Sequence, residues 1–240
     1  ESWTVGGALT TQALVRVSNG NGSDTSNATF EISAAVVDTT PPTVSASGYD
    51  AAWHNHAVIL TLTASDAESG VKCLWWSAND DPTWNQILGS TVQVTVPAPA
   101  DHSWDRDNTI WYCGEDNVGN HTDPMTAYCD VKIDTRKPVT RAPYAVSVVR
   151  GRTATLKYKV VDARPGSPTA TVTIKVKNRA GKVVKTLGAY KAKTVNTLLA
   201  ARFTVPRTWR TGTYRFLIYA KDAAGNAQVL PAGSNRLIVR

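Results

Sequence analysis

The sequence predicts an all-β protein made of β-sandwiches in series, and three observations support this class. Apolar and polar side chains alternate with a period of two in Thr155–Val160, Val172–Lys177 and Tyr214–Ala220, as in strands with one buried and one solvated face. Turn signals such as Asn79–Pro82 and Arg179–Gly181 recur along the chain. No long amphipathic helical pattern is present. Strands of this length, separated by frequent turns, are typical of sandwiches.

Two repeated segments divide the chain of 240 residues into units. Asp38-Thr39-Thr40-Pro41-Pro42 is followed 96 residues later by Asp134-Thr135-Arg136-Lys137-Pro138, and Glu115–Asn120 is echoed by Lys221–Asn226. Repeats at this spacing indicate structural units that follow one another. We therefore expect one sandwich in residues 39–135 and a second in residues 136–240. The prolines at the joints should stiffen the connections.

Residues 1–38 are too short for a sandwich of their own. Ala13–Val17 and Ala28–Ile32 have the pattern of two strands, and the polar segment 18–27 is predicted to be the loop between them. These residues therefore resemble the terminal hairpin of a partial unit. Because an isolated hairpin is marginally stable in water, we expect it to pack on the middle unit or on another chain.

Charge is divided unequally between the units. Residues 1–135 carry four basic and 17 acidic side chains, a net charge of −13, whereas residues 136–240 carry 22 basic and two acidic ones, a net charge of +20. In the C-terminal unit, basic side chains fall at outward positions of predicted strands: Lys157, Lys159, Lys175, Lys177, Arg215 and Lys221. Such a face attracts anions. The predicted partner is an anionic cell-envelope polymer or the acidic unit of another copy. Nucleic acid is disfavoured because aromatic residues do not interleave with the basic ones.

The middle unit also carries an ordered set of motifs: a leading Trp, an acidic Ser-Gly turn, a second Trp and an Asp-x-x-Gly-Asn hairpin. These are Trp53, Asp66–Val71, Trp84, Asp116–Asn120 and the closing Val131–Asp134. In this order they resemble bacterial extracellular Ig-like repeats. The C-terminal unit resembles the Ig-like domain of flagellar hook-capping proteins and of secreted-protein C-termini, through Asn178–Leu187, Gly212–Tyr214 and Asp222–Asn226. The resemblances imply tandem Ig-like or fibronectin-III-like sandwiches and an extracellular or cell-surface location.

Acidic loops of the middle unit offer oxygen ligands to calcium, which prefers carboxylate and carbonyl oxygens. The candidate ligands are Asp66, Glu68, Asp116 and Asn117. The alternative is that Asp116 and Asp222 brace their turns by hydrogen bonds, with glycine supplying a positive φ. We favour the alternative because the same motif recurs in the basic unit. No cofactor other than this calcium is expected. His54 and His56 share one face of a strand, but without a third ligand they do not make a convincing zinc site.

Six of the eight tryptophans and all three cysteines lie in the middle unit. Most tryptophans are expected to pack in the core, while Trp76 and Trp104 are candidates for stacking on a glycan. If the protein is exported, one disulfide beside one free thiol is expected, either Cys113–Cys129 or Cys73–Cys113.

These observations predict a protein that is not an enzyme. The sequence lacks the Gly-x-Ser-x-Gly, His-Glu-x-x-His and phosphate-loop motifs, so no catalytic residues are proposed. It also lacks an apolar run long enough to span a bilayer. The leading hypothesis is a structural or adhesive module of a secreted or surface protein that self-associates head to tail. The alternatives are accessory domains of a secreted hydrolase and a glycan-binding module that uses the tryptophans of the middle unit.

Overall fold

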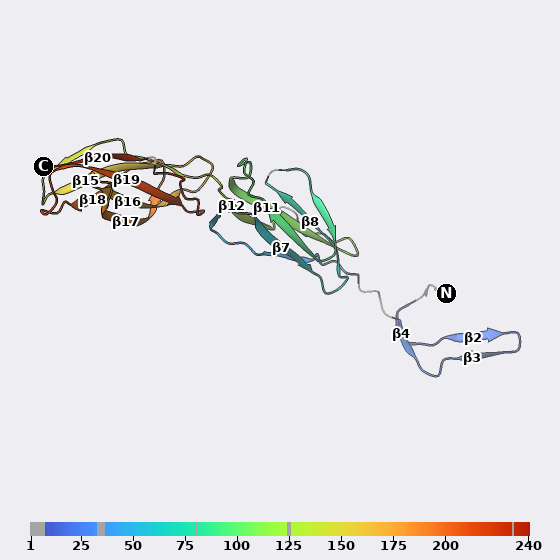
Figure 1. Ribbon diagram of the computed structural model, residues 1–240. Coiled ribbons are helices and arrows are strands. Elements are labelled where there is room, and N and C mark those ends of the chain that lie inside the picture. The colour runs from blue at the N-terminus through green and yellow to red at the C-terminus, as the bar shows by residue number, and fades with distance from the viewer. Residues whose placement is uncertain (1–7, 33–36, 80, 124–125, 232) are drawn as a thin grey trace. The chain divides into compact units, whose positions relative to one another are not determined.

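The computed structural model describes residues 8–32, 37–79, 81–123, 126–231 and 233–240 (Figure 1). Its described residues form 20 strands and no helix, which confirms the predicted all-β, Ig-like class. The described part of the chain thus offers no helix with the length and apolarity to cross a membrane. Two compact units are present, Glu1–Thr40 and Pro41–Arg240.

The first unit contains two short antiparallel pairs. Strand β1 (Thr10–Ala13) pairs with β4 (Phe30–Ile32). Strand β2 (Arg16–Asn19) pairs with β3 (Gly22–Thr25). The hairpin of β2 and β3 takes in the end of the predicted strand Ala13–Val17 and most of the predicted loop 18–27. Both expectations are therefore corrected: the predicted strand is divided between β1 and β2, and the loop is not one long irregular segment. The missed signal is the dipeptide Gly20-Asn21 at the tip, a two-residue sequence that favours tight hairpins.

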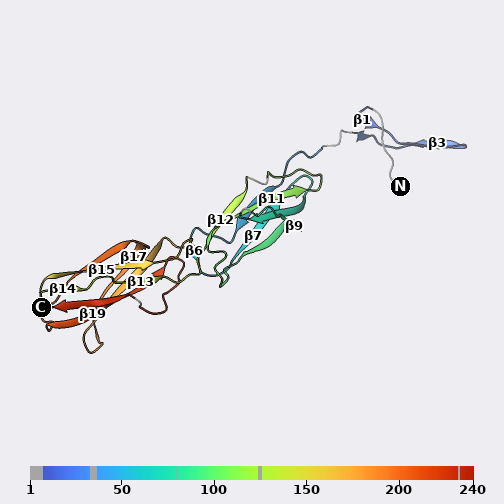
Figure 2. The same cartoon turned by 90° about the horizontal axis from the view of Figure 1, so that it is seen from above.

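The middle sandwich, within Pro41–Arg240, has a three-stranded and a five-stranded sheet (Figure 2). The first has the order β10 (Thr91–Val96), β7 (Val58–Ser65), β5 (Thr43–Ser47). The second has the order β6 (Trp53–His54), β12 (Tyr128–Ile133), β11 (Arg106–Asp116), β8 (Val71–Ala78), β9 (Asn85–Leu88). All pairs are antiparallel except β12 with β6.

The C-terminal sandwich repeats this topology strand for strand. Its three-stranded sheet has the order β13 (Val139–Arg141), β15 (Thr153–Val161), β18 (Leu198–Thr204). Its five-stranded sheet has the order β14 (Val146–Val148), β20 (Ser234–Val239), β19 (Gly212–Asp222), β16 (Thr169–Lys177), β17 (Val183–Thr194). Thus β5 to β12 correspond in order to β13 to β20, and the repeated sequence segments occupy equivalent places in the two sandwiches.

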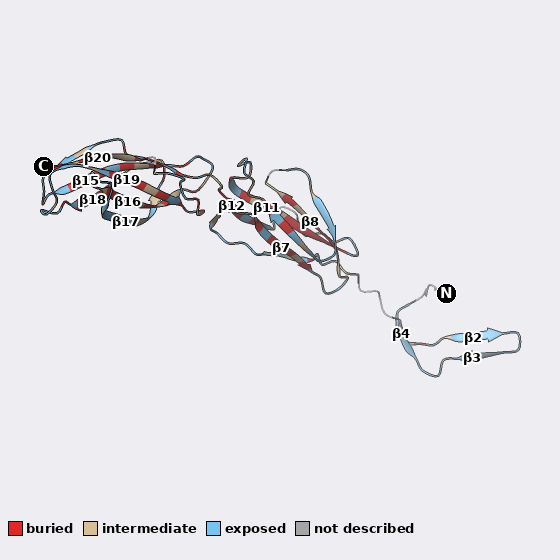
Figure 3. Ribbon diagram, viewed as in Figure 1, coloured by how far each residue is buried: buried red, intermediate tan, exposed pale blue. Residues whose placement is uncertain are grey.

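Each sandwich has its own apolar core between its two sheets, coloured red in Figure 3. In the C-terminal sandwich, the predicted alternation of β15 buries Leu156, Tyr158 and Val160, while that of β19 buries Phe216 and Ile218. The alternate residues of the same strands point outward. Since a one-residue slip would exchange these two faces, the apolar pattern fixes which polar side chains reach the surface.

Candidate functional site

Three aspartates meet in the interior of the C-terminal half of the chain. Asp134 directly follows β12, Asp162 directly follows β15 and Asp222 is the last residue of β19. Their exposed fractions are 0%, 4% and 5%. One carboxylate oxygen from each lies within 4.8 Å of those of the other two. We call these three residues the junction triad, because Asp134 lies where the middle sandwich ends and the other two belong to the C-terminal sandwich.

Hydrogen bonds fix two members of the triad. The Ser167 amide donates to Asp134 Oδ2 at 2.7 Å, and the Arg136 amide donates to Asp134 Oδ1 at 3.1 Å. Asn226 donates from its backbone amide to Asp222 Oδ1 at 2.8 Å and from Nδ2 to Asp222 Oδ2 at 2.9 Å. The same Nδ2 also donates to the carbonyl of Asp134 at 2.7 Å. Asn226 therefore joins the segment that links the sandwiches to the end of β19.

The third member, Asp162, is different. Neither of its carboxylate oxygens has a hydrogen-bond partner among the described residues, although its backbone is held on both sides by Asn196. Burial, followed by the nearby charges of Asp134 and Asp222, raises the pKa of Asp162 to about 7, and the Ala163 amide and Arg136 offset only part of this rise. Burial likewise raises the pKa of Asp222 despite its hydrogen bonds to Asn226. The triad therefore concentrates negative charge that its own surroundings do not balance.

The guanidinium whose charge acts on Asp162, that of Arg136, also faces a carboxylate outside the triad. Arg136 Nε lies 3.5 Å from Oδ2 of Asp105, a fourth carboxylate with an exposed fraction of 1%. His102 Nδ1 lies 3.3 Å from the same oxygen, and the amide and hydroxyl of Thr135 both donate to Asp105 Oδ1. Arg136 is thus shared between Asp105 and the triad.

The equivalent loops of the middle sandwich hold Asp66 and Asp116, which were weighed as calcium ligands against a turn-bracing role, and backbone amides of the same loops donate to both. The amides of Glu68, Ser69 and Gly70 donate to Asp66 Oδ1. Those of Val118, Gly119 and Asn120 donate to Asp116 Oδ1. Although burial by itself would raise the pKa of Asp116, these bonds hold it below its usual value. Gly119 has a φ of +96°, which confirms that the motif braces its turn.

The four predicted calcium ligands lie on two adjoining loops but play different roles. Carboxylate oxygens of Asp66 and Asp116 lie within 4.8 Å of each other. Asn117 instead turns its Nδ2 to the Ser69 carbonyl, at 2.8 Å, and so ties the two loops together. Glu68 takes part here through its backbone amide, which donates a hydrogen bond to Asp66 Oδ1. His54 pairs with Asp50, with 3.0 Å between Nε2 and Oδ1, and its ring meets that of His56 edge-on.

Sequence reasoning missed Asp134 and Asp162 as members of one cluster. Both carried a signal: Asp134 opens a repeated segment, and Asp162 is one of two acidic residues in 136–240. Their meeting depends on the strand order of the folded sandwich.

The basic residues predicted to form one face lie on two opposite faces, which corrects that expectation. Lys157 and Lys159 belong to β15 and point outward from the three-stranded sheet. The others point outward from the five-stranded sheet, on β16 and β19: Lys175, Lys177, Arg215 and Lys221. Alternation predicted correctly that all six leave the core, but it does not say which sheet each strand joins.

On the five-stranded sheet three cations stand side by side. Arg215 is paired in register with Lys177 on β16 and with Arg236 on β20. We call Lys177, Arg215 and Arg236 the basic row. Lys175 occupies the outward position of β16 next to Lys177. Its ammonium lies 4.9 Å from the ring centroid of Tyr219. Arg236 was not singled out from the sequence, although it alternates with the buried Leu237 in the same way as the others.

Trp76 and Trp104, predicted to stack on a glycan, pack instead against the core of the middle sandwich. Two outward aromatic residues, Trp111 and Tyr128, are paired in register on β11 and β12. Their ring centroids are 5.0 Å apart, and Tyr128 is 53% exposed. The alternation of Trp111 with the buried Ile110 and Tyr112 is the signal that identifies this pair.

All three cysteines are free and buried, so neither predicted disulfide is present. Cys129 packs in the core opposite Ile110, whereas Cys113 lies one residue beyond the core-facing Tyr112 and points to the other face of the sheet. Cys73 is opposite Glu115 and Cys113 is opposite Trp75, so these two are offset along their strands. A bridge needs Cβ atoms about 4 Å apart, which directly opposed positions offer and diagonal ones do not.

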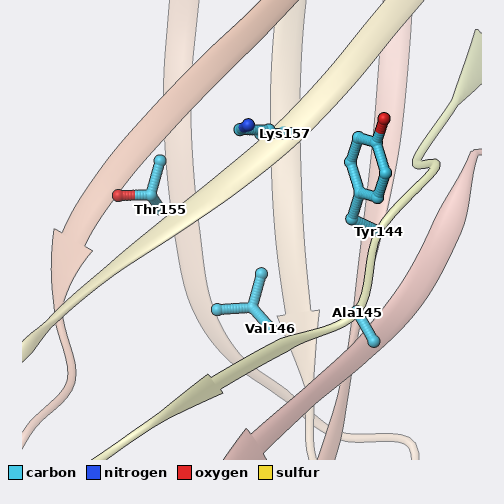
Figure 4. A pocket seen from close by; sticks show the side chains of 5 residues that line it. All are labelled: Tyr144, Ala145, Val146, Thr155 and Lys157. Atoms are coloured by element: carbon cyan, nitrogen blue, oxygen red, sulfur yellow. The ribbon is translucent and has the colours of Figure 1, made fainter.

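A surface pocket lies at the edge of the C-terminal sandwich (Figure 4). It is lined by Tyr144, Ala145, Val146, Thr155 and Lys157. The Lys157 ammonium lies 5.6 Å from the ring centroid of Tyr144. The polar groups on offer are therefore one ammonium and two hydroxyls, which suit weak anion contact better than acid–base chemistry.

No protein-family model matches the sequence, and no curated protein matches it. Solved structures with a similar arrangement include a chain of a 1.5-MDa bacterial ice-binding adhesin, at 14% identity and a TM-score of 0.42. The match covers 84% of this chain and 66% of the adhesin chain. The α-2-macroglobulin of Escherichia coli is 12% identical, with a TM-score of 0.32 and coverage of 94% and 18%. The human OSCAR ligand-binding domain is 11% identical, with a TM-score of 0.32 and coverage of 82% and 95%.

Proposed function

We propose that this chain is a non-catalytic structural and adhesive segment of an extracellular protein, and that its C-terminal sandwich holds an anionic polysaccharide of the cell envelope. One observation carries the proposal. The acidic residues of 136–240 are Asp162 and Asp222, and both are buried. Every charged side chain that this sandwich exposes is therefore basic.

The basic row supports contact with a partner rather than mere solubility. Like charges directly opposite one another on neighbouring strands are destabilising, and the row contains two such contacts in succession. A sandwich selected only for solubility would gain by mixing the signs of its surface charges. An anionic partner turns the same repulsion into attraction on binding.

The partner that fits best is a polymer with repeated acidic groups. Neighbouring strands are about 4.8 Å apart, so the row presents its cations at closely repeated intervals across β16, β19 and β20. The resemblance of the motifs to bacterial extracellular Ig-like repeats favours an envelope polysaccharide. The acidic unit of a second copy is the alternative anion, and it would produce head-to-tail association.

Binding to an acidic polysaccharide such as polyglucuronate, with neutral dextran as the reference, tests the proposal. The triple variant Lys177→Gln, Arg215→Gln and Arg236→Gln should lose most of the binding. The matched control, Lys157→Gln, Lys159→Gln and Arg202→Gln, removes the same charge from the other sheet and should bind nearly as well as the wild type. Binding should weaken steeply from about 0.05 M to about 0.5 M salt, because screening shortens the reach of exposed charges.

Three results would contradict the proposal: equal loss in both triple variants, salt-independent binding, and no preference over dextran. Sedimentation of the protein alone provides a separate outcome. Association of copies at low salt without polysaccharide binding would show that the basic row serves self-association instead.

A second candidate function, glycan stacking on the middle sandwich, is favoured by the outward pair of Trp111 and Tyr128. Aromatic faces exposed in this way stack on sugar rings. Glycan-array binding should then vanish in Tyr128→Ala, whose side chain is exposed, with thermal unfolding nearly unchanged. Retained binding in that variant would eliminate this candidate.

A further inference from the structure

We infer that the junction triad of Asp134, Asp162 and Asp222 is a binding site for a divalent cation of the calcium type. The inference does not depend on polysaccharide binding, since it concerns the joint between the sandwiches rather than their outer faces. It also differs from the calcium site predicted from the sequence, whose aspartates are occupied by backbone amides of their own turns.

The spacing of the three carboxylates suits one ion. Oxygen ligands lie about 2.3–2.6 Å from a bound calcium ion, so two ligands on opposite sides are at most about 5 Å apart. One oxygen from each aspartate lies within 4.8 Å of the others, so no two of them are too far apart to bind the same ion. The three carboxylates come from the ends of three different strands, β12, β15 and β19, and already lie close together in the structure.

The state of Asp162 is an independent observation that indicates a missing partner. Its side chain is 4% exposed, yet neither carboxylate oxygen receives a hydrogen bond from the described residues. Buried polar groups are hydrogen-bonded in the great majority of cases, and a buried carboxylate without a counter-charge is unfavourable. A cation bound by Asp162 removes both anomalies at once.

The protein groups around the triad do not supply this cation. Arg136 is the basic residue whose charge acts on Asp162, and its Nε faces Asp105. Asp134 and Asp222 receive hydrogen bonds from backbone amides and from Asn226. These bonds orient the carboxylates and reduce the charge only in part. One divalent ion would bring the triad from −3 to −1, with Arg136 close by.

The chemistry of the ligands selects the class of ion. The triad offers only oxygen atoms, which excludes the nitrogen and sulfur sets that zinc prefers. Calcium accepts irregular sets of carboxylate, carbonyl and water oxygens, whereas magnesium demands a near-octahedral arrangement and retains more of its water. Three carboxylates fixed by separate strand ends are therefore better suited to calcium.

Binding would have a mechanical consequence. Asp134 belongs to the segment between the sandwiches, while Asp162 and Asp222 end strands of opposite sheets of the C-terminal sandwich. A shared ion would cross-link the linking segment to both sheets, in addition to the hydrogen bond that Asn226 donates to the Asp134 carbonyl. The joint would then stiffen when calcium is present and loosen when it is removed.

The test uses the whole chain, stripped of metal with a chelator, and compares it with two variants. Asp162→Asn removes the unpaired carboxylate with almost no change of volume. Asp107→Asn removes an exposed carboxylate of the middle sandwich and serves as the control for net charge. Calcium chloride is the probe, followed by titration calorimetry and thermal unfolding.

We expect the wild type and Asp107→Asn to bind calcium with a Kd on the order of 10⁻⁴ M, as in extracellular modules. At about 100 times that concentration the unfolding temperature should rise by at least about 5 °C. Asp162→Asn should bind at least about tenfold more weakly and lose most of the thermal shift. Absence of a calcium effect in the wild type, or an undiminished effect in Asp162→Asn, would overturn the inference.

If Asp162→Asn fails to fold, an NMR spectrum of the backbone amides of the isotope-labelled wild type can locate the site without any substitution. Calcium should shift the amide signals of Ala163, Ser167 and Asn226, which adjoin the triad. Shifts confined to Ser69, Gly70 and Gly119 would assign the ion to the middle sandwich and reject the triad as its site.

Discussion

Reversing the central charge of the basic row should make the protein more stable and less adhesive. Arg215 stands between Lys177 and Arg236 on neighbouring strands. Arg215→Glu converts two like-charge pairs into two opposite-charge pairs, and cross-strand pairs contribute roughly 0.2–1 kcal/mol each. The expected gain in the free energy of unfolding is about 1 kcal/mol at low salt, since all three side chains lie at the surface and are partly screened.

Urea unfolding of the wild type, Arg215→Glu and Arg202→Glu measures this gain. Arg202 lies directly opposite the uncharged Thr155. Arg202→Glu therefore changes the net charge of the protein as Arg215→Glu does, but it does not turn a like-charge pair into an opposite-charge pair. The gain of Arg215→Glu over Arg202→Glu should shrink at about 0.5 M salt, because the pairs are screened. In the same samples, Arg215→Glu should bind acidic polysaccharide far more weakly than Arg202→Glu.

Opposite signs for stability and binding are the critical result. A structural role for Arg215 would lower both together in Arg215→Glu. If the variant is no more stable than Arg202→Glu at low salt, the cations of the row do not repel one another appreciably. The argument that an anionic partner relieves the repulsion would then fail.

Three further predictions concern the interior. With calcium removed, the free energy of unfolding should fall as pH rises from about 4 to about 7. Burial raises the pKa of Asp162 to about 7, so in this range the folded protein retains a proton that the unfolded chain releases. In urea unfolding at several pH values Asp162→Asn should flatten this pH dependence, and an unchanged pH dependence would show that Asp162 is not its source. Asn226→Ala removes the Nδ2 donor from Asp222 Oδ2 and from the Asp134 carbonyl, while the backbone amide of residue 226 still donates to Asp222 Oδ1. The free energy of unfolding should therefore fall by about 2 kcal/mol, and a loss no larger than that of an exposed Asn→Ala change would count against it. Reductant should not alter the unfolding temperature, since the cysteines are free and burial raises the pKa of the Cys113 thiol to about 11. If the mass of the intact protein is lower before reduction than after it by the mass of two hydrogen atoms, a disulfide is present and this prediction is wrong.

Much of the fold could be predicted from the sequence because alternation is a local property. In β15, β16 and β19 the buried residues are those that the period of two marks as apolar. The turn role of the Asp-x-x-Gly-Asn motif was also readable, since the hydrogen bonds of Asp116 and Asp222 stay within four residues of each aspartate. The hairpin at Gly20-Asn21 had a local signal as well, which the polar composition of its flanks obscured.

The parts that escaped prediction depend on contacts between distant segments. Lys157 and Lys177 have the same outward pattern, but β15 and β16 join different sheets, so their side chains lie on opposite faces. Trp75 and Trp76 must point in opposite directions, and only the packing of Trp76 against the apolar core shows that it is the one that faces inward. The residues of the junction triad lie at the ends of three strands, β12, β15 and β19, and are up to 88 residues apart in the sequence. No local sequence pattern specifies that they come close together in the fold.

The two proposals are linked by the position of the acidic residues. If Asp162 and Asp222 lay on the surface of the C-terminal sandwich, they would pair with its lysines and arginines and weaken its attraction for anions. Their burial in the junction triad keeps the exposed charge wholly basic, but it leaves carboxylates in the interior, where an unpaired charge is unfavourable. A divalent ion taken from the medium neutralises them without drawing an exposed lysine or arginine inward. The same arrangement thus holds the sandwiches together at the joint and leaves the basic row available to its partner.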